Sequence, residues 1–193
     1  MTELITSIGD IKIGETNQFP YGWRKAAKGR TVWRLLEEVI SQNLEAKAAS
    51  LGMRDFHPAS SEVGVYDFAF HYDKTSPIYV NIKSAVKGGR TNKDDISKAV
   101  PLRAFMSEDR VCVLLIATIV IEFLSDPHRI RLSECHVMPV AWLPDVYVNP
   151  SNNGNLQSAR YKDIDGSVRR TTIEFISVLD EHIQIALGKK IRK

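Results

Sequence analysis

Apolar residues recur at helical spacing in two stretches of the chain. Between residues 31 and 50 they occupy every third or fourth position, and Gly52 follows. The stretch 171–187 has the same spacing. Because this spacing places apolar side chains on one face of a helix, it is typical of helices that pack against a core. The sequence therefore predicts an amphipathic helix over 31–50 and a C-terminal helix over 171–187.

Two neighbouring carboxylates in the first of these helices differ in their position relative to the apolar face. With about 100° of rotation per residue, that face is centred near Leu36 and Ile40. Glu37 then falls at the border of the face, whereas Glu38 falls almost opposite, towards solvent. If the helix contributes to a site on a sheet packed against it, Glu37 is the residue that we expect there.

Runs of β-branched and aromatic residues predict strands. Two such runs cover 63–72 and 78–84. The intervening segment, 73–77, has the composition of a turn, so the two strands are expected to form an antiparallel hairpin. The run 111–123 predicts a buried central strand, and 135–143 predicts a further strand.

The remaining segments are polar, with one more helix among them. Residues 8–30, 87–95 and 149–160 contain Gly, Pro, Asn and charged residues and are interpreted as loops, the first of them as an N-terminal arm. Residues 95–107 have a helical pattern, in which Pro101 indicates a kink or a broken start.

This order of elements predicts an α/β fold with one central mixed β-sheet flanked by helices. The 193 residues fit one core, so a single domain over 1–193 is expected. We divide it into an N-terminal arm (1–30), a core that carries the chemistry (31–145), a polar loop (146–167) and a C-terminal helix (168–193).

The composition is that of an ordinary globular protein, with 44% hydrophobic and 25% charged residues. The formal net charge of +3 excludes a histone-like polycation but permits a basic cleft on a mixed surface. Cys112 and Cys135 lie in apolar runs without metal-ligand spacing, so we expect two reduced thiols.

No membrane association is predicted from the sequence. Residues 1–12 lack the basic start and long apolar stretch of a signal peptide. The longest apolar run, 111–124, is interrupted by Glu122 and is shorter than the roughly 20 residues that a membrane-spanning helix needs. A cytoplasmic protein is expected.

Three polar residues in the predicted hairpin carry the candidate chemistry. Because side chains alternate along a strand, Asn81 and Lys83 share one face of the strand 78–84. A buried ammonium group is costly unless it is paired. Asp67 lies in the middle of the preceding predicted strand and also needs a partner. Antiparallel pairing across the turn brings Asp67 near Asn81 and Lys83.

Such a trio has what phosphodiester hydrolysis requires. The Asp67 carboxylate, the Asn81 amide oxygen and the Ile82 backbone carbonyl are hard oxygen ligands of the kind that Mg²⁺ prefers. The Lys83 ammonium would hold an attacking water and offset the charge that develops on phosphorus. The alternative from the residues alone is a plain salt bridge between Asp67 and Lys83, with Asn81 satisfied by hydrogen bonds.

The order of these residues resembles the pattern of the PD-(D/E)XK nucleases. In that superfamily a helix Glu precedes an Asp, and an acidic residue then stands two positions before a Lys; here the corresponding residues are Glu37, Asp67 and the run Asn81-Ile82-Lys83. The basic loop 87–93 and the Asn-rich stretch 150–158 extend the resemblance over residues 30–160. The closer resemblance is to type II restriction endonucleases of the EcoRV and HincII kind.

The resemblance implies an Mg²⁺-dependent endonuclease that cuts double-stranded DNA at a specific palindromic sequence, as a homodimer whose subunits each cut one strand. Glu37, Asp67, Asn81 and Lys83 would be its catalytic residues, and Asp67, Asn81 and Ile82 its metal ligands.

The chain departs from the family pattern at two positions. Asn81 stands where most members have Asp or Glu, which removes one negative charge and should weaken Mg²⁺ binding. Tyr66 stands where the family has Pro before its Asp. Glu62 is close enough in sequence to serve instead as an acidic ligand, and this alternative stays open.

The two polar loops supply the predicted DNA contacts. Asn and Gln pair bidentately with adenine and Arg with guanine in the major groove, whereas a basic loop clamps phosphates without specifying sequence. An ordinary solvated connection is the alternative for each loop. The predicted contacts are Lys87, Arg90, Asn92, Lys93, Asn152, Asn153, Asn155, Gln157 and Arg160.

Three other functions are compatible with these residues. One is a repair or nicking nuclease of the same fold. Another is a DNA-binding protein without catalysis, in which Asn81 marks a degraded site. The third is an α/β domain unrelated to nucleic acids.

Overall fold

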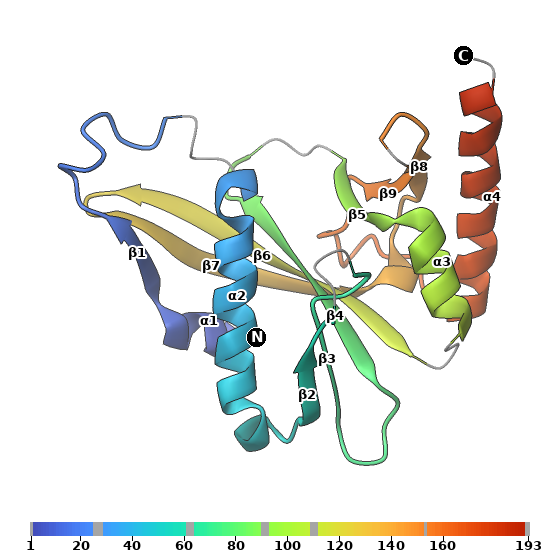
Figure 1. Ribbon diagram of the computed structural model, residues 1–193, viewed down its shortest axis with the longest axis horizontal. Coiled ribbons are helices and arrows are strands. Elements are labelled where there is room, and N and C mark those ends of the chain that lie inside the picture. Colours follow the sequence, from blue (N-terminus) through green and yellow to red (C-terminus); the bar gives the residue numbers. More distant parts are fainter. Residues whose placement is uncertain are drawn as a thin grey trace.

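A computed structural model of the chain describes residues 2–24, 29–60, 64–89, 93–108, 112–152 and 154–191. Within these residues it is a mixed α/β fold with a six-stranded sheet, a three-stranded sheet and helices on both sides of the larger sheet (Figure 1). The predicted fold class, a central mixed sheet flanked by helices, is confirmed.

The larger sheet has the strand order β1-β7-β6-β4-β3-β2. Only β4 and β6 run parallel among its neighbouring pairs in the described residues; the other pairs are antiparallel. Its strands are β1 (Asp10–Gly14), β2 (Arg54–Pro58), β3 (Phe68–His71), β4 (Ile78–Val86), β6 (Val113–Ser125) and β7 (His128–Pro139). The predicted antiparallel hairpin is the β3–β4 pair, and the predicted central strand is β6.

The smaller sheet is antiparallel, with the order β5-β9-β8. It consists of β5 (Asp94–Lys98), β8 (Tyr147–Asn149) and β9 (Asn155–Ser158). The helices are α1 (Thr2–Ile8), α2 (Gly29–Lys47), α3 (Ala99–Glu108) and α4 (Thr172–Ile191), and two short 3-10 turns lie at Ala49–Leu51 and Val140–Trp142.

Each face of the larger sheet has its own apolar core. On one face α1 and α2 pack over Phe68 and Ile82, and on the other α3, α4 and the smaller sheet pack over Ile116 (Figure 1). The α2 side chains that enter the first core are those predicted at the centre of its apolar face, including Leu36 and Ile40, which are fully buried. Burial of each such side chain stabilises the fold by about 1.5–3 kcal/mol.

The C-terminal helix begins where the sequence predicts it. The Thr171 backbone N–H donates to Glu174 Oε2 (2.7 Å), and the Glu174 N–H donates to Thr171 Oγ1 (3.2 Å). This reciprocal capping satisfies two donors that the first turn of a helix leaves unpaired. Phe175 and Leu179 then fix the helix against the core because both are fully buried.

Several segments predicted as loops are strands. Residues 10–14, predicted as part of an arm, form β1 at the edge of the larger sheet, where they pair with β7. β5 begins at the end of the predicted loop 87–95 and continues to Lys98, so the first residues of the predicted helix 95–107 are a strand. β8 and β9 lie within the segment 146–167, which was also predicted as a loop. These strands have only three to five residues, too few for an alternating pattern, and pairing with distant segments holds them.

Other boundaries differ from the prediction by a few residues. Asp67 does not lie in mid-strand; it directly precedes β3. β7 begins at His128, earlier than predicted, and β2 was not predicted. Pro101 lies in the first turn of α3, where a missing backbone N–H is tolerated, so it marks the start of the helix and not a kink.

The structure bears on the predictions for the cysteines and for membrane-spanning helices. Cys112 and Cys135 are not joined in a disulfide, in agreement with the predicted reduced thiols. No helix in the described part of the chain is both long enough and apolar enough to cross a membrane.

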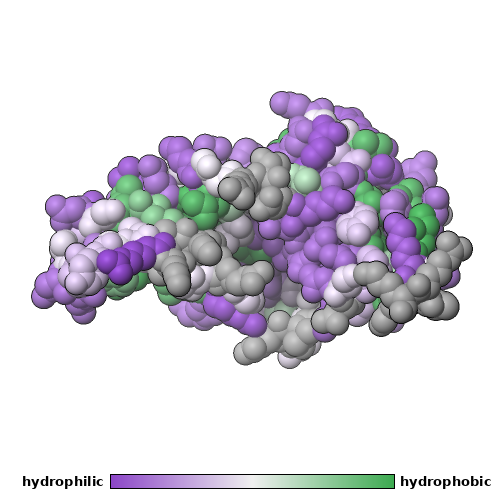
Figure 2. Space-filling view, turned by 90° about the horizontal axis from the view of Figure 1, so that it is seen from above, coloured by the Kyte–Doolittle hydropathy of each residue, from purple (hydrophilic) through white to green (hydrophobic). Residues whose placement is uncertain are grey.

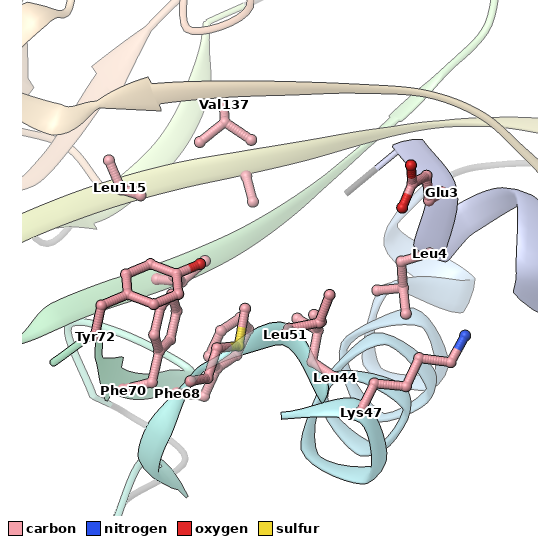
Figure 3. A pocket seen from close by; sticks show the side chains of 13 residues that line it. Glu3, Leu4, Leu44, Lys47, Leu51, Phe68, Phe70, Tyr72, Leu115 and Val137 are labelled. Carbon is pink, nitrogen blue, oxygen red and sulfur yellow. The ribbon is translucent and has the colours of Figure 1, made fainter. Parts of the chain in front are cut away.

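An apolar pocket of about 310 Å³ opens on the α2 side of the larger sheet (Figure 3). Glu3 and Lys47 are the charged residues among the described ones that line it. Its apolar lining comes from α1, α2, the turn after α2, and strands β3, β4, β6 and β7: Leu4, Leu44, Leu51, Met53, Phe68, Phe70, Tyr72, Val80, Leu115, Ala117 and Val137.

Candidate active site

β3 pairs with only the first part of β4, so one edge of the rest of β4 has no strand beside it among the described residues. The β3–β4 ladder runs from the Phe70–Ile78 pair to the Phe68–Val80 pair, after which the Asp67 N–H donates to the Val80 carbonyl (2.8 Å). β4 continues to Val86 beyond this point. The continuing strand therefore borders a hollow where β3 would otherwise lie.

Asp67 takes over the role of the missing strand partner. Its Oδ2 atom accepts a hydrogen bond from the backbone N–H of Ile82 (2.5 Å). In a strand the N–H and C=O of one residue point to the same side, so the Ile82 carbonyl faces the same edge. Burial raises the pKa of Asp67, and the Ile82 N–H and the positive charge of Lys83 partly offset that rise.

Asn81 presents a buried oxygen without a partner. The side chain is only 7% exposed, and its Nδ2 donates to the Val65 carbonyl (2.9 Å). Its Oδ1 atom accepts no hydrogen bond within the part of the chain that the structure describes. A buried acceptor left unpaired costs about 1–3 kcal/mol, so a group that binds this oxygen would recover that cost.

Lys83 lies two residues further along β4, on the same face as Asn81. Burial lowers the pKa of its ammonium group, while the negative charges of Asp67, Glu37, Asp95 and Asp94 raise it. The ion pairs of the described residues include none between Lys83 and Asp67 within 4.0 Å. The plain salt bridge that the sequence left open is therefore not formed.

Glu37 reaches this region from α2. Its side chain is half-buried, and burial together with the neighbouring charge of Asp67 raises its pKa to about 7. Glu38 is exposed and accepts a hydrogen bond from Gln42 (2.6 Å), away from the hollow. The predicted choice of Glu37 over Glu38 agrees with these positions. Glu62 lies outside the described residues.

These side chains surround two adjoining hollows of about 220 and 620 Å³, between α2, β4 and the smaller sheet. The smaller hollow brings together the four predicted catalytic residues, Glu37, Asp67, Asn81 and Lys83. Ile82 lines the larger one. Figure 2 looks down on the molecule and shows an indentation between its α2 side and its α3–α4 side, with hydrophilic side chains gathered on the latter.

Charged side chains of both signs line the two hollows. Four carboxylates and three ammonium groups of the described residues line them: Glu37, Asp67, Asp94 and Asp95, against Lys83, Lys93 and Lys98. A cation bound among the carboxylates would add positive charge where a phosphate group could bind.

The donor atoms suit a small divalent cation. Asp67, the unpaired Oδ1 of Asn81 and the Ile82 carbonyl are all oxygen donors, which Mg²⁺ prefers. No group of three or more His, Cys, Asp or Glu residues with metal-binding geometry occurs in the described residues. The predicted site does not require one, because two of its three ligands are an amide oxygen and a backbone carbonyl.

The predicted phosphate-clamping loop is described in part. Arg90 and Asn92 lie outside the described residues, as does Asn153 of the second loop. Lys93 lines the larger hollow, and its ammonium group lies 3.8 Å from the centre of the Tyr147 ring. Lys87 is exposed and pairs with Glu122 (3.5 Å).

The amides predicted to read bases have partners within the protein. Asn152 and Gln157 line the larger hollow, and both donate hydrogen bonds to Asp95. Asn155 lines the smaller hollow, and its Oδ1 is buried without a partner among the described residues. Arg160 lines neither hollow and forms an ion pair with Asp163 (2.6 Å).

Two residues of the hollows, Asp94 and Asp95, were missed because their segment was predicted as a loop. Asp94 accepts a hydrogen bond from the hydroxyl of the buried Tyr161, and burial and this carboxylate raise the pKa of Tyr161. An acidic pair directly before the buried Ile96 was the available signal. Five residues are too few to distinguish a strand from a loop by pattern.

Sequence comparisons identify no relative of the chain. The chain matches no protein-family model and has no significant match among curated proteins. The function is therefore argued from the residues of the site and their arrangement.

Proposed function

We propose that the chain is a type II restriction endonuclease of the PD-(D/E)XK superfamily, which hydrolyses phosphodiester bonds of double-stranded DNA at a specific palindromic sequence with Mg²⁺. The observation that carries the proposal is the unpaired, buried Oδ1 of Asn81 in a hollow that also contains Asp67, Lys83 and Glu37. Most buried acceptors have a partner, so an unpaired oxygen beside charged groups in a hollow favours a bound ligand.

Asp67, Asn81 and the Ile82 carbonyl would hold the cation. When bound, Mg²⁺ would supply a lowered pKa for a coordinated water and a positive charge next to the phosphoryl oxygens. Asn81 is a neutral ligand, so binding should be weaker than at a site with two carboxylates.

Side chains of the protein would orient the attacking water, stabilise the developing charge and transfer protons. The Lys83 ammonium, surrounded by carboxylates, would orient the attacking water and stabilise the additional negative charge as the new P–O bond forms and the ester P–O bond breaks. Glu37, with a pKa of about 7, can accept or release a proton near neutral pH. The leaving oxygen of DNA takes up a proton as it departs.

Binding to DNA would use the exposed basic residues near the hollows. Lys87 and Lys93 would contact phosphates, which position the duplex without reading its sequence. A palindromic site implies a homodimer in which each subunit cuts one strand, and the mass of the protein in solution tests this part. Cytoplasmic location belongs to the same proposal and rests on the sequence alone.

Digestion of a fully sequenced phage DNA with Mg²⁺, followed by mapping of the ends, tests the proposal. We expect discrete fragments whose ends share one short palindrome. Nicks without double-strand breaks would favour a repair or nicking nuclease. Salt-sensitive DNA binding without hydrolysis in Mg²⁺ or Mn²⁺ would indicate a catalytically inactive binding protein. The absence of both DNA binding and DNA cleavage would refute a role in nucleic-acid chemistry.

A further inference from the structure

Asp95 connects the smaller sheet to the two hollows of the candidate site. It lies on β5, opposite Gln157 of β9, and the register shifts between Asp95 and Ser97. Ile96 at this irregularity is 2% exposed and anchors the strand in the core. Such bulges redirect a side chain next to a site, and here Asp95 lines both hollows.

The Asp95 carboxylate is held by two amides. Asn152 Nδ2 donates to Oδ1 (3.1 Å) and Oδ2 (2.9 Å), and Gln157 Nε2 donates to Oδ1 (2.6 Å). Gln157 Oε1 in turn accepts a hydrogen bond from Asn149 Nδ2 (3.2 Å). Each end of the Gln157 amide therefore already has a partner inside the protein.

The hollow that Asp95 lines also contains buried oxygens that lack partners. Asn81 is more than nine-tenths buried, and its Oδ1 has no partner among the described residues. Asn155 is only partly buried, but its Oδ1 atom is also buried and without a partner among those residues. Both residues line the smaller hollow with Asp95. Unsatisfied acceptors beside a fixed carboxylate are what a cation site presents before its ion binds.

We propose, on the basis of the nuclease function proposed above, that Asp95 is a further carboxylate of the cation site and that Asn152 and Gln157 position it and do not read bases. Hydrogen bonds to two amides restrict the rotation of the Asp95 side chain. The β8–β9 hairpin thereby supports the cation site, as outer residues that orient metal ligands do in other proteins.

The two roles for Asn152 and Gln157 predict different results. Residues that read bases change which sequences are cut when they are replaced. Residues that position Asp95 instead change cation affinity, and the rate of cutting falls by the same factor at every sequence. The second outcome is expected here for the variant that carries both Asn152→Ala and Gln157→Ala.

Mn²⁺ binding to the full chain without DNA, measured by electron paramagnetic resonance, gives a readout that does not depend on cleavage. We expect Asp95→Asn and the double amide variant each to weaken Mn²⁺ binding by about tenfold or more. Asp73→Asn is the matched control, because Asp73 is an exposed carboxylate that pairs with Arg54 and lines neither hollow. Thermal unfolding of each variant identifies any loss of folding.

The outcomes separate this inference from the proposed function. If the wild-type chain binds Mn²⁺ and cuts DNA while Asp95→Asn does both equally well, only the inference is wrong. A double amide variant that binds Mn²⁺ normally but cuts new sequences would also overturn it, in favour of base reading. If the wild-type chain neither binds Mn²⁺ nor cuts, the proposed function fails and the inference fails with it.

Discussion

The apolar pocket and the smaller polar hollow share α2 and β4, yet they differ completely in chemistry. The pocket is lined by Val80 of β4. It is also lined by Leu44 of α2 and Phe68 of β3, which Figure 3 labels. The smaller hollow is lined by Glu37 of α2, Asn81 of β4 and Asp67, which directly precedes β3. Asp67 and Phe68 are neighbours in the chain, as are Val80 and Asn81, and in each pair one residue lines the hollow and the other lines the pocket.

The difference follows from the alternation of side chains along a strand. Val80 faces the core under α2, and Asn81 faces the other side of the sheet, where β3 no longer covers the edge of β4. One residue of register therefore separates a site that stabilises the fold from one that carries charge. Variants of adjacent residues should have distinct effects, on stability on one side and on chemistry on the other.

The largest effect is expected at Lys83. Lys83→Ala should lower the rate of DNA cleavage by about 1000-fold, because it removes the ammonium that offsets the developing charge. Cleavage rates measured at saturating Mg²⁺ test this. Lys12→Ala is the control, since Lys12 is an exposed residue of β1 that pairs with Glu15. Equal rates for the two variants would contradict the assignment.

On the apolar side, Phe68→Ala should lower the free energy of unfolding by about 3–5 kcal/mol, because it leaves a cavity in a packed core. Phe68 is 1% exposed. Denaturant titration measures the loss. Tyr72→Ala, at the more exposed rim of the same pocket, should cost clearly less. Similar losses for both would mean that the pocket is not part of a packed core.

The fold was predictable where apolar patterns are long. The helix over 31–50, the strands β4 and β6, and α4 all span enough residues for periodicity to identify them. β2, β5, β8 and β9 have three to five residues each, and their conformation depends on pairing with distant segments. β5 illustrates this, because only Ile96 among its five residues is buried and apolar.

The candidate site was predictable to the same extent. Asn81 and Lys83 were predicted because polar side chains on one face of an otherwise apolar strand need partners. Glu37 was predicted in preference to Glu38 because the rotation per residue places it at the border of the apolar face of its helix. Asp95 could not be found in this way, because its side chain reaches the hollow only through the pairing of β5 with β9. The same pairing engages Gln157, which sequence reasoning assigned to base contacts.

A moderate effect on the stability of the folded chain is expected from binding of the cation. With a dissociation constant of about 1 mM, 10 mM Mg²⁺ would stabilise the folded chain by about 1.4 kcal/mol and raise its melting temperature by a few degrees. Asn81→Ala should abolish this rise, and Leu44→Ala in the apolar pocket should retain it despite a lower starting stability. A rise that survives Asn81→Ala would show that the ion binds elsewhere.

The smallest effect concerns Glu37, whose pKa is raised by burial and by Asp67 from 4.5 to about 7. Between these two values the unfolded chain has lost the Glu37 proton while the folded chain still holds it, so this group makes stability fall as pH rises from 4.5 to 7. Glu37→Gln removes that contribution.

The free energy of unfolding of the Glu37→Gln variant should therefore exceed that of the wild type by more at pH 8 than at pH 5. Denaturant titrations at both pH values measure the difference. Glu38→Gln is the matched control for loss of a carboxylate on the same helix. A Glu37→Gln variant whose advantage is the same at both pH values would contradict the raised pKa.

The most direct test of the central claim is the anomalous difference map of a crystal of the protein soaked in Mn²⁺. The account predicts a peak in the hollow, about 2.1 Å from oxygens of Asp67 and Asn81 and from the Ile82 carbonyl. A map with no peak there at saturating Mn²⁺, with the Asn81 amide oxygen still unpaired, would contradict it.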